Sequence, residues 1–315
     1  MQKKLLALAV AAALPMVSQA ATADVTIYGK VHTSIDYVNP NGSGLDSIYD
    51  VTSRASRLGF KGSEDLGDGL KLIWKMETTY NAAEGGFGSG RNAYIGLAGG
   101  WGTFLYGRHD TPMKMSTGKL DIFVDEMGDY NATAGFLDVR ANDAIAYVSP
   151  NFSGLTLVGA FIPDADYDGD GDLAGGYSLA AMYSNGGLFL AAGYESLDDL
   201  FGGASLDHWR IGVGYDMGAF HIGAIYADQG DVTASNNYMI NGSWKFGNNK
   251  LKAEWAQIDP DNGSKTDAWV IGLDHNFSKR TKMYVQYADS EHGLQSTNYK
   301  GLDQTGISFG MVHKF

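Results

Sequence analysis

The feature of this sequence that most constrains its fold is an alternation of apolar and polar residues with a period of two, repeated along most of the chain. In residues 207–216, for example, one face carries Trp209, Ile211, Val213 and Tyr215, and the other carries histidine, arginine and glycine. This period is typical of a β-strand with one apolar face. The chain has neither a sustained helical period nor an apolar run of about 18 residues, so we expect an all-β fold without membrane-spanning helices.

Sixteen strands are predicted between Asp24 and the C-terminus, and the connections between them alternate in length. Short connections rich in Gly, Asn and Ser occur at residues 184–187, 216–219, 247–250 and 278–281, as in tight hairpin turns. The other connections are longer and more polar. An even number of strands with alternating short turns and long loops is typical of a closed antiparallel barrel that crosses a membrane.

The positions of the large aromatic residues distinguish a membrane barrel from a soluble two-sheet sandwich, which would show the same alternation. Aromatic rings bracket the apolar faces at both ends, as Trp209 does with Tyr215 and Phe220 with Tyr226. Two aromatic bands are expected where a barrel meets the two membrane interfaces, whereas a soluble core favours large rings at strand centres. We therefore predict a transmembrane antiparallel β-barrel of 16 strands, with residues 24–315 as a single domain.

The face opposite the apolar residues is predicted to line an aqueous lumen, because it is polar and rich in lysine. Its charged residues and histidine are Lys30, His32, Asp36, Arg57, Lys61, Lys71, Lys75, Glu77, Arg140, Arg210, Lys245, Lys252, Glu254 and Lys282. A barrel of 16 strands is wide enough to hold a water-filled channel. The alternative interpretation of any single inward lysine is a solvated wall residue without a specific role.

The first 23 residues are predicted to be a secretory signal peptide. Lys3 and Lys4 precede an apolar run over residues 5–14, and small residues at Ala20 and Ala23 provide two candidate cleavage sites. The alternative, an amphipathic N-terminal helix, is disfavoured because no polar residue interrupts the apolar run. The mature chain is therefore expected to work outside the cytoplasm.

The charge of the chain makes a nucleic-acid partner unexpected. It has 23 Lys and Arg against 36 Asp and Glu, a net charge of −13, which becomes −15 once the two lysines of the signal peptide are removed. Phosphate binding needs clustered Lys and Arg on an accessible surface. Because lysine and arginine dominate the inward face, the negative charge is expected to concentrate in the loops.

The sequence carries no recognisable catalytic motif, so neither an enzyme nor a cofactor is predicted. There is no cysteine, no H-E-x-x-H, no G-x-S-x-G and no phosphate-binding G-x-x-x-x-G-K-[ST], and the seven histidines lack metal-ligand spacing. Residues 164–172, DADYDGDGD, match part of a calcium-binding loop, but its twelfth position is Gly175 instead of a bidentate Glu. We interpret this segment as an acidic external loop, and no metal site is predicted.

Several long segments occur in the order in which a known family has them. They are DVTIYGKVHTSIDY from Asp24, SRLGFKGSEDLGDGLKLIWKMET from Ser56, RNAYIGLAGGWGTFLYGRHDTP from Arg91, NDAIAYVSPNFSGL from Asn142 and the terminal GMVHKF. On these segments the chain resembles the Gram-negative general (non-specific) porins of proteobacterial outer membranes. The resemblance implies a homotrimer of 16-stranded barrels in the bacterial outer membrane, surrounded by lipid and lipopolysaccharide. It also implies passive conduction of ions and small hydrophilic solutes.

The resemblance further implies that the third external loop folds into the lumen as a constriction. The longest segment without alternation, residues 111–139, lies in the corresponding place and carries Asp121, Asp125, Glu126, Asp129 and Asp138. By resemblance these acids would face a basic wall of Lys30, Arg57, Lys61, Arg108 and Arg140. Opposed charges across a narrow lumen create a transverse field that selects solutes by charge. Without the resemblance, the segment would be interpreted as a solvated surface loop. Arg108 follows Phe104 and Tyr106 at intervals of two residues, so it would lie with them on the lipid face if the strand extended that far.

The ion preference and the substrate range remain open at this stage. The net charge and the loop acids favour cations and the inward lysines and arginines favour anions, and our expectation leans to cations. The alternative function is a substrate-specific outer-membrane channel, but inward aromatics such as Tyr28, Tyr94 and Tyr284 are few and dispersed. The terminal Phe315 resembles the signal read by the barrel-assembly machinery, and its alternative interpretation is an ordinary lipid-facing strand end.

Overall fold

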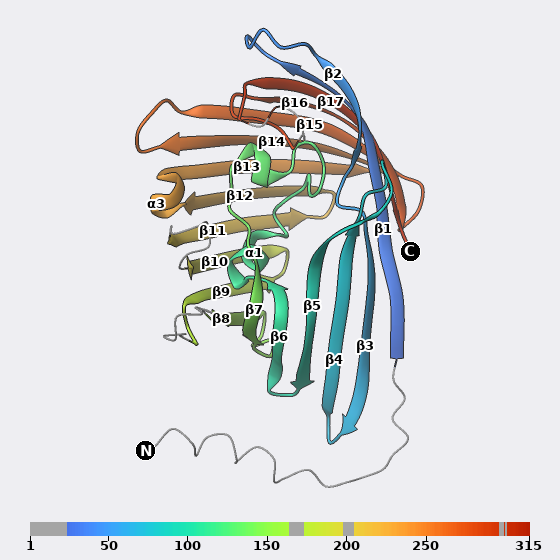
Figure 1. Cartoon of the computed structure of the whole chain (residues 1–315), viewed down its shortest axis with the longest axis vertical. Coiled ribbons are helices and arrows are strands. Elements are labelled where there is room, and N and C mark those ends of the chain that lie inside the picture. Colours follow the sequence, from blue (N-terminus) through green and yellow to red (C-terminus); the bar gives the residue numbers. More distant parts are fainter. Residues whose placement is uncertain (1–23, 164–172, 198–204, 296–298, 300) are drawn as a thin grey trace.

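The computed structural model describes residues 24–163, 173–197, 205–295, 299 and 301–315 (Figure 1). The predicted signal peptide and the acidic segment 164–172 lie outside the described residues. The strands, in chain order, are β1 (Asp24–Pro40), β2 (Ile48–Ser53), β3 (Arg57–Gly67), β4 (Leu70–Tyr80), β5 (Phe87–Gly99), β6 (Gly102–Asp110), β7 (Arg140–Val148), β8 (Leu155–Ile162), β9 (Gly176–Asn185), β10 (Leu188–Leu197), β11 (Leu206–Met217), β12 (Phe220–Asp228), β13 (Ser235–Phe246), β14 (Asn249–Pro260), β15 (Thr266–Asn276), β16 (Thr281–Ser290) and β17 (Gln304–Lys314).

These strands form one closed antiparallel sheet. The first and last strands pair along their length, from Lys30 opposite Lys314 to Pro40 opposite Gln304, which closes the barrel. β2 and β3 both pair with the same edge of β1 and are separated by three residues, among them Ala55 with a φ of 46°. They are two halves of one interrupted strand, so the 17 segments make the predicted barrel of 16 strands.

The period-two pattern of the sequence gives the barrel an apolar outer surface. In β11 the side chains of Trp209, Ile211, Val213 and Tyr215 are exposed, and the intervening residues of that stretch are buried. The same alternation recurs in other strands, including β15 and β17. A surface of exposed Ile, Leu, Val and aromatic side chains is what a barrel presents to lipid.

Aromatic residues pair across neighbouring strands at both ends of this surface. Near the short turns, the rings of Phe220 and Trp244 stack with their centres 6.0 Å apart. Near the long connections, the ring of Tyr226 lies 5.1 Å from Trp209 and 5.2 Å from Tyr238. This arrangement supports the two predicted aromatic bands.

Connections alternate in length as predicted. Gly186 and Gly187, both with positive φ, form the two-residue turn between β9 and β10, a backbone conformation that favours glycine. The long connections contain the short helices α1 (Pro112–Thr117), α2 (Tyr130–Thr133) and α3 (Gly230–Thr233). Among the described residues, the helices are all too short or too polar to cross a membrane.

Candidate functional site

The longest connection, residues 111–139 between β6 and β7, has a defined local structure. The hydroxyl of Thr111 caps α1 by accepting from the backbone N–H of Lys114, and Pro112 occupies the first turn. The carboxylate of Asp129 caps α2 by accepting from the backbone N–H of Asn131 at 3.0 Å. We call these residues the β6–β7 segment.

Apolar side chains of the β6–β7 segment pack against the sheet on the face opposite its exposed residues. Leu120, Tyr130 and Phe136 belong to a buried cluster with residues of β10, β12, β13 and β14, including Met239. Phe123 and Met127 belong to a second cluster with residues of β1, β15 and β16. Segment and wall therefore share a core, unlike a loop that is solvated on both sides.

Arg210 on β11 joins the two ends of the segment. Its guanidinium, which is fully buried, donates to the hydroxyl of Thr117 at 3.0 Å, to the carboxylate of Asp138 at 2.9 Å and to the carbonyl of Leu137 at 3.0 Å. The same group lies 4.6 Å from the ring centre of Phe136. Because one side chain bonds residues 20 positions apart, it fixes both limbs of the segment to the wall.

Asp125 is the acid of the segment that contacts the wall of β1 and β3. Its carboxylate accepts from the ammonium of Lys30 at 2.5 Å and lies 3.7 Å from the guanidinium of Arg57. Both cations belong to the predicted basic wall. The surrounding cations keep the pKa of Asp125 below its usual value, although burial acts in the opposite direction.

Glu126 contacts a different part of the wall. Its two carboxylate oxygens accept from the ammonium groups of Lys252 on β14, at 2.7 Å, and Lys282 on β16, at 2.6 Å. Both lysines also bond Asp274 on β15, each at 3.0 Å. The sequence pattern predicts both lysines on the inward face, but neither belongs to the predicted basic wall of the constriction.

Asp121 and Asp129 do not meet wall cations among the described residues. One oxygen of Asp121 accepts from the backbone N–H of Phe123 at 2.9 Å, and the other is buried without a hydrogen-bond partner. Burial, together with the carboxylates of Asp129 and Glu254, raises the pKa of Asp121 well above its usual value. Burial also raises the pKa of Asp129 to about 6. Of the five predicted acids, Asp125, Glu126 and Asp138 thus form ion pairs, and Asp121 and Asp129 are buried without cations among the described residues.

Two further members of the predicted basic wall have other partners. Lys61 is exposed, and its ammonium lies 5.4 Å from the ring centre of Tyr28. Arg140 forms an ion pair with Asp110 at 2.8 Å and donates to the side-chain oxygen of Asn92 at 2.7 Å. Asp110 was missed by the sequence analysis because it ends a strand next to the segment.

Arg108 lies apart from the acids of the segment. It donates to the carbonyl of Gly90 at 3.1 Å and to the side chain of Asn142. It keeps the parity of Phe104 and Tyr106, whose side chains are exposed on the outer surface. The structure therefore does not bring Arg108 to Asp121, Asp125, Glu126 or Asp129.

A cluster that the sequence analysis did not assemble centres on Glu77 of β4. Its carboxylate accepts from Tyr28 at 2.7 Å and from Arg91 at 2.6 Å, and lies 3.4 Å from the ammonium of Lys75. Arg54, in the break between β2 and β3, was also missed. It forms a buried ion pair with Asp36 at 2.5 Å.

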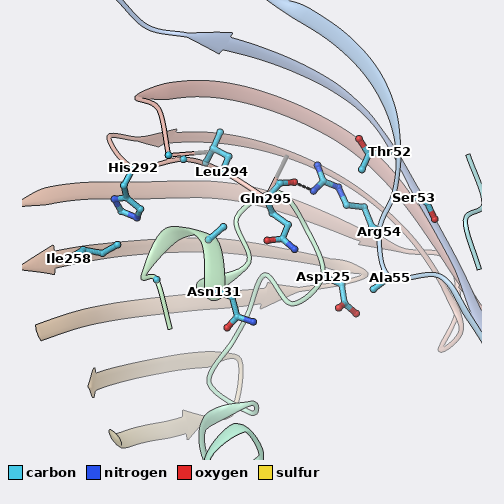
Figure 2. Close-up of a pocket in the computed structure, with 14 residues that line it drawn as sticks. Thr52, Ser53, Arg54, Ala55, Asp125, Asn131, Ile258, His292, Leu294 and Gln295 are labelled. Carbon is cyan, nitrogen blue, oxygen red and sulfur yellow. Dashed lines mark hydrogen bonds between the residues drawn. The ribbon is translucent and has the colours of Figure 1, made fainter. Parts of the chain in front are cut away.

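A cavity of about 500 Å³ lies between the β6–β7 segment, the break after β2 and residues 292–295 (Figure 2). Figure 2 shows Asp125, Asn131, His292 and Gln295 around it, with Arg54 donating to the carbonyl of Gln295. The backbone N–H of Gln295 donates to the carbonyl of Met127 at 3.0 Å, so the last long connection is bonded to the segment.

The terminal Phe315 lies at the seam of the barrel. Its backbone exchanges two hydrogen bonds of 3.1 Å with Gly29, and its half-exposed ring lies so close that a Cβ atom at Gly29 would be 2.4 Å from a ring carbon. Glycine at position 29 leaves room for this ring.

A closed antiparallel barrel with an apolar outer surface and a charged inner surface is the architecture of a protein that spans a membrane with β-strands. The sequence model of the Gram-negative porins matches residues 7–293, and the chain belongs to this family. The family and the fold identify a non-enzymatic channel for passive diffusion in the bacterial outer membrane.

Related sequences align with the whole length of the chain. The sequence is 32% identical to outer membrane porin protein 32 of Delftia acidovorans and 30% identical to the major outer membrane protein P.IB of Neisseria meningitidis serogroup B, with all of each chain covered. The anion-selective porin from Comamonas acidovorans has a similar structure, with a TM-score of 0.82 and 28% identity over 93% of this chain and 100% of that one. A mutant porin of Rhodopseudomonas blastica shares the fold, with a TM-score of 0.71 and 21% identity over 93% of this chain and all of that one.

Proposed function

We propose that the β6–β7 segment folds into the lumen and narrows it, so that solutes pass through the space left beside the wall of β1, β3, β4 and β5. The ion pairs of Asp125 with Lys30 and Arg57 support this proposal. The bonds of Glu126 to Lys252 and Lys282 support it further, because they attach the segment to a second part of the wall. A constriction formed in this way selects solutes by size and charge.

At this constriction we propose a preference for anions, whereas the expectation from the sequence is a preference for cations. The observation that carries the proposal is the environment of the acids of the segment. Asp121 and Asp129 are buried and have raised pKa values, and Glu126 is bonded to two lysines. The opposite wall is more basic than acidic. Around Asp125 and Glu77 it carries five cations, namely Lys30, Arg57, Lys61, Lys75 and Arg91.

Comparison with a relative points the same way, since the structurally similar porin of Comamonas acidovorans is described as anion-selective. The net charge of −13 counts every residue of the chain, whereas the charges nearest the narrowest point have the largest effect on a permeating ion because they are least screened. Of the predicted wall, Lys30, Arg57 and Lys61 belong to the proposed constriction, Arg140 borders it beside Asp110, and Arg108 is left out.

The reversal potential of the purified protein in a planar bilayer, under a potassium chloride gradient, tests this proposal. The sign that corresponds to chloride permeation is expected. A potential of the opposite sign, or channels that do not conduct, would contradict it. Sugars added to the bath should leave the current unchanged, which separates a general channel from a substrate-specific one.

The family resemblance also supports proposals on assembly. We propose a homotrimer in outer-membrane lipid and lipopolysaccharide, a signal peptide over residues 1–23 that is cleaved after Ala20 or Ala23, and recognition of Phe315 by the barrel-assembly machinery. The exposed ring of Phe315 at the strand end is compatible with such recognition. Cross-linking of the protein in membranes should give a trimer.

A further inference from the structure

Glu77 is held in place by the wall around it. Tyr28 on β1 donates to one carboxylate oxygen at 2.7 Å, and Arg91 on β5 donates through its Nε to the other at 2.6 Å. The ammonium of Lys75 is 3.4 Å from the oxygen that Tyr28 bonds. The carboxylate therefore has a fixed position within a group of cations.

An irregularity in the sheet brings Arg91 to this carboxylate. Met76 pairs with Ala93, but Thr78 pairs with Gly90, so that two residues of β5 lie opposite Glu77 alone. A bulge of this kind changes the direction of a side chain relative to its strand. It turns Arg91, which has the parity of the outward-facing Ile95, toward Glu77.

The cations around Glu77 are more accessible than the carboxylate. The side chains of Arg57, Lys75 and Arg91 are 25%, 21% and 17% exposed, whereas that of Glu77 is 5% exposed. A guanidinium has five N–H donors and an ammonium has three, so both kinds of group can bond a second anion beside the one already bound. A passing anion thus meets cations that are already partly neutralised.

We propose that Glu77 is a resident anionic ligand of these cations, which weakens the binding of permeating anions and so keeps their transit fast. The proposal rests on the anion preference proposed above. Conduction requires a site attractive enough for an ion to enter and weak enough for it to leave. Without Glu77, the same cations form a binding site for small oxyanions such as inorganic phosphate, which bonds Arg and Lys through several oxygens.

The test measures chloride conductance against salt concentration for the wild type and for Glu77→Gln, and then the effect of adding inorganic phosphate. The substitution keeps the size of the side chain and removes its charge. We expect the half-saturating salt concentration to fall by about threefold or more, as a full charge near the ion path implies. We also expect phosphate to block the chloride current of the variant at concentrations that leave the wild type unaffected.

Two control variants separate this role from a structural one. Glu84→Gln makes the same chemical change in an exposed connection, and it should leave the half-saturating concentration unchanged. The double variant Glu77→Gln/Arg91→Gln restores the charge balance of the cluster. It should return both the half-saturating salt concentration and the sensitivity to phosphate toward wild-type values.

The outcomes distinguish this inference from the proposed function. A wild type that prefers anions, with a Glu77→Gln variant unchanged in half-saturation and insensitive to phosphate, overturns the role of Glu77 alone. A wild type that prefers cations overturns the proposed preference as well. If Glu77→Gln does not assemble, Glu77→Asp takes its place. Its shorter side chain cannot keep the contact with Arg91, so a smaller fall in half-saturation is expected, and no change would overturn the inference.

Discussion

Neutralising Asp125 is expected to increase the anion preference of the channel by a calculable amount. Its side chain is 21% exposed, against 2% for Glu126, so a permeating ion has more access to Asp125 than to Glu126. A unit charge about 6 Å from an ion contributes about 0.7 kcal/mol in water, which is about a threefold change in local ion concentration. Removing the negative charge raises the local concentration of anions and lowers that of cations. Asp125→Asn should therefore raise the chloride-to-potassium permeability ratio by about three- to ninefold, and the lower value applies where salt screens the charge.

Asp121→Asn provides a matched control for this prediction. It makes the same substitution four residues earlier in the same segment, at a carboxyl that is buried and whose pKa is raised well above its usual value. Burial disfavours the charged form of such a carboxyl, so less charge is lost when it becomes an amide. Reversal potentials under a potassium chloride gradient should therefore shift for Asp125→Asn and stay near wild type for Asp121→Asn. Equal shifts for the two variants would refute this division of the segment acids.

Three further predictions concern the segment and the seam. Arg210→Met should destabilise the protein by about 3–5 kcal/mol, because it leaves the carboxylate of Asp138 buried without its cation, and should increase open-channel noise in single-channel recordings. Asp129, with a pKa of about 6 in the folded chain and an ordinary value when unfolded, stabilises the fold fully below about pH 4, and this contribution is lost as the pH rises through about 6. Thermal unfolding midpoints should show this decline in the wild type, whereas Asp129→Asn, which keeps the helix cap, should show a smaller decline, because Asp121, whose pKa is also raised, is unchanged in it; equal declines would contradict the assignment. Phe315→Ala should reduce the amount of protease-resistant barrel in outer membranes, and an unchanged amount would argue against its role in assembly.

The sequence predicts the barrel well because a lipid-facing strand leaves a strong local pattern. The alternation over Trp209, Ile211, Val213 and Tyr215 corresponds directly to exposed side chains. The strand count of 16 is also recovered, although the structure divides one strand at Ala55, whose positive φ is not readable from its identity. Period and turn chemistry are local properties, and that is why they can be read without the fold.

The site is predicted less completely, because its geometry depends on departures from the regular pattern. Arg91 reaches Glu77 through a bulge, and Arg54 bonds Asp36 from a break in a strand. The alternation of residues along a regular strand therefore does not predict the direction of either arginine side chain. Asp121 resembles Asp125 in the sequence, but its burial raises its pKa well above the usual value. Whether an acid in a loop is charged depends on tertiary packing, which the sequence pattern does not record.

The proposed narrowing of the channel by the β6–β7 segment can be tested by modifying a single thiol. The chain has no cysteine, so Asp125→Cys introduces a unique site, and Glu84→Cys supplies a matched thiol in an exposed connection. A bulky, water-soluble thiol reagent is added to open channels in a planar bilayer. The proposed narrowing predicts a stepwise fall in single-channel conductance for Asp125→Cys and no fall for Glu84→Cys. A modified Asp125→Cys channel with undiminished conductance would contradict it.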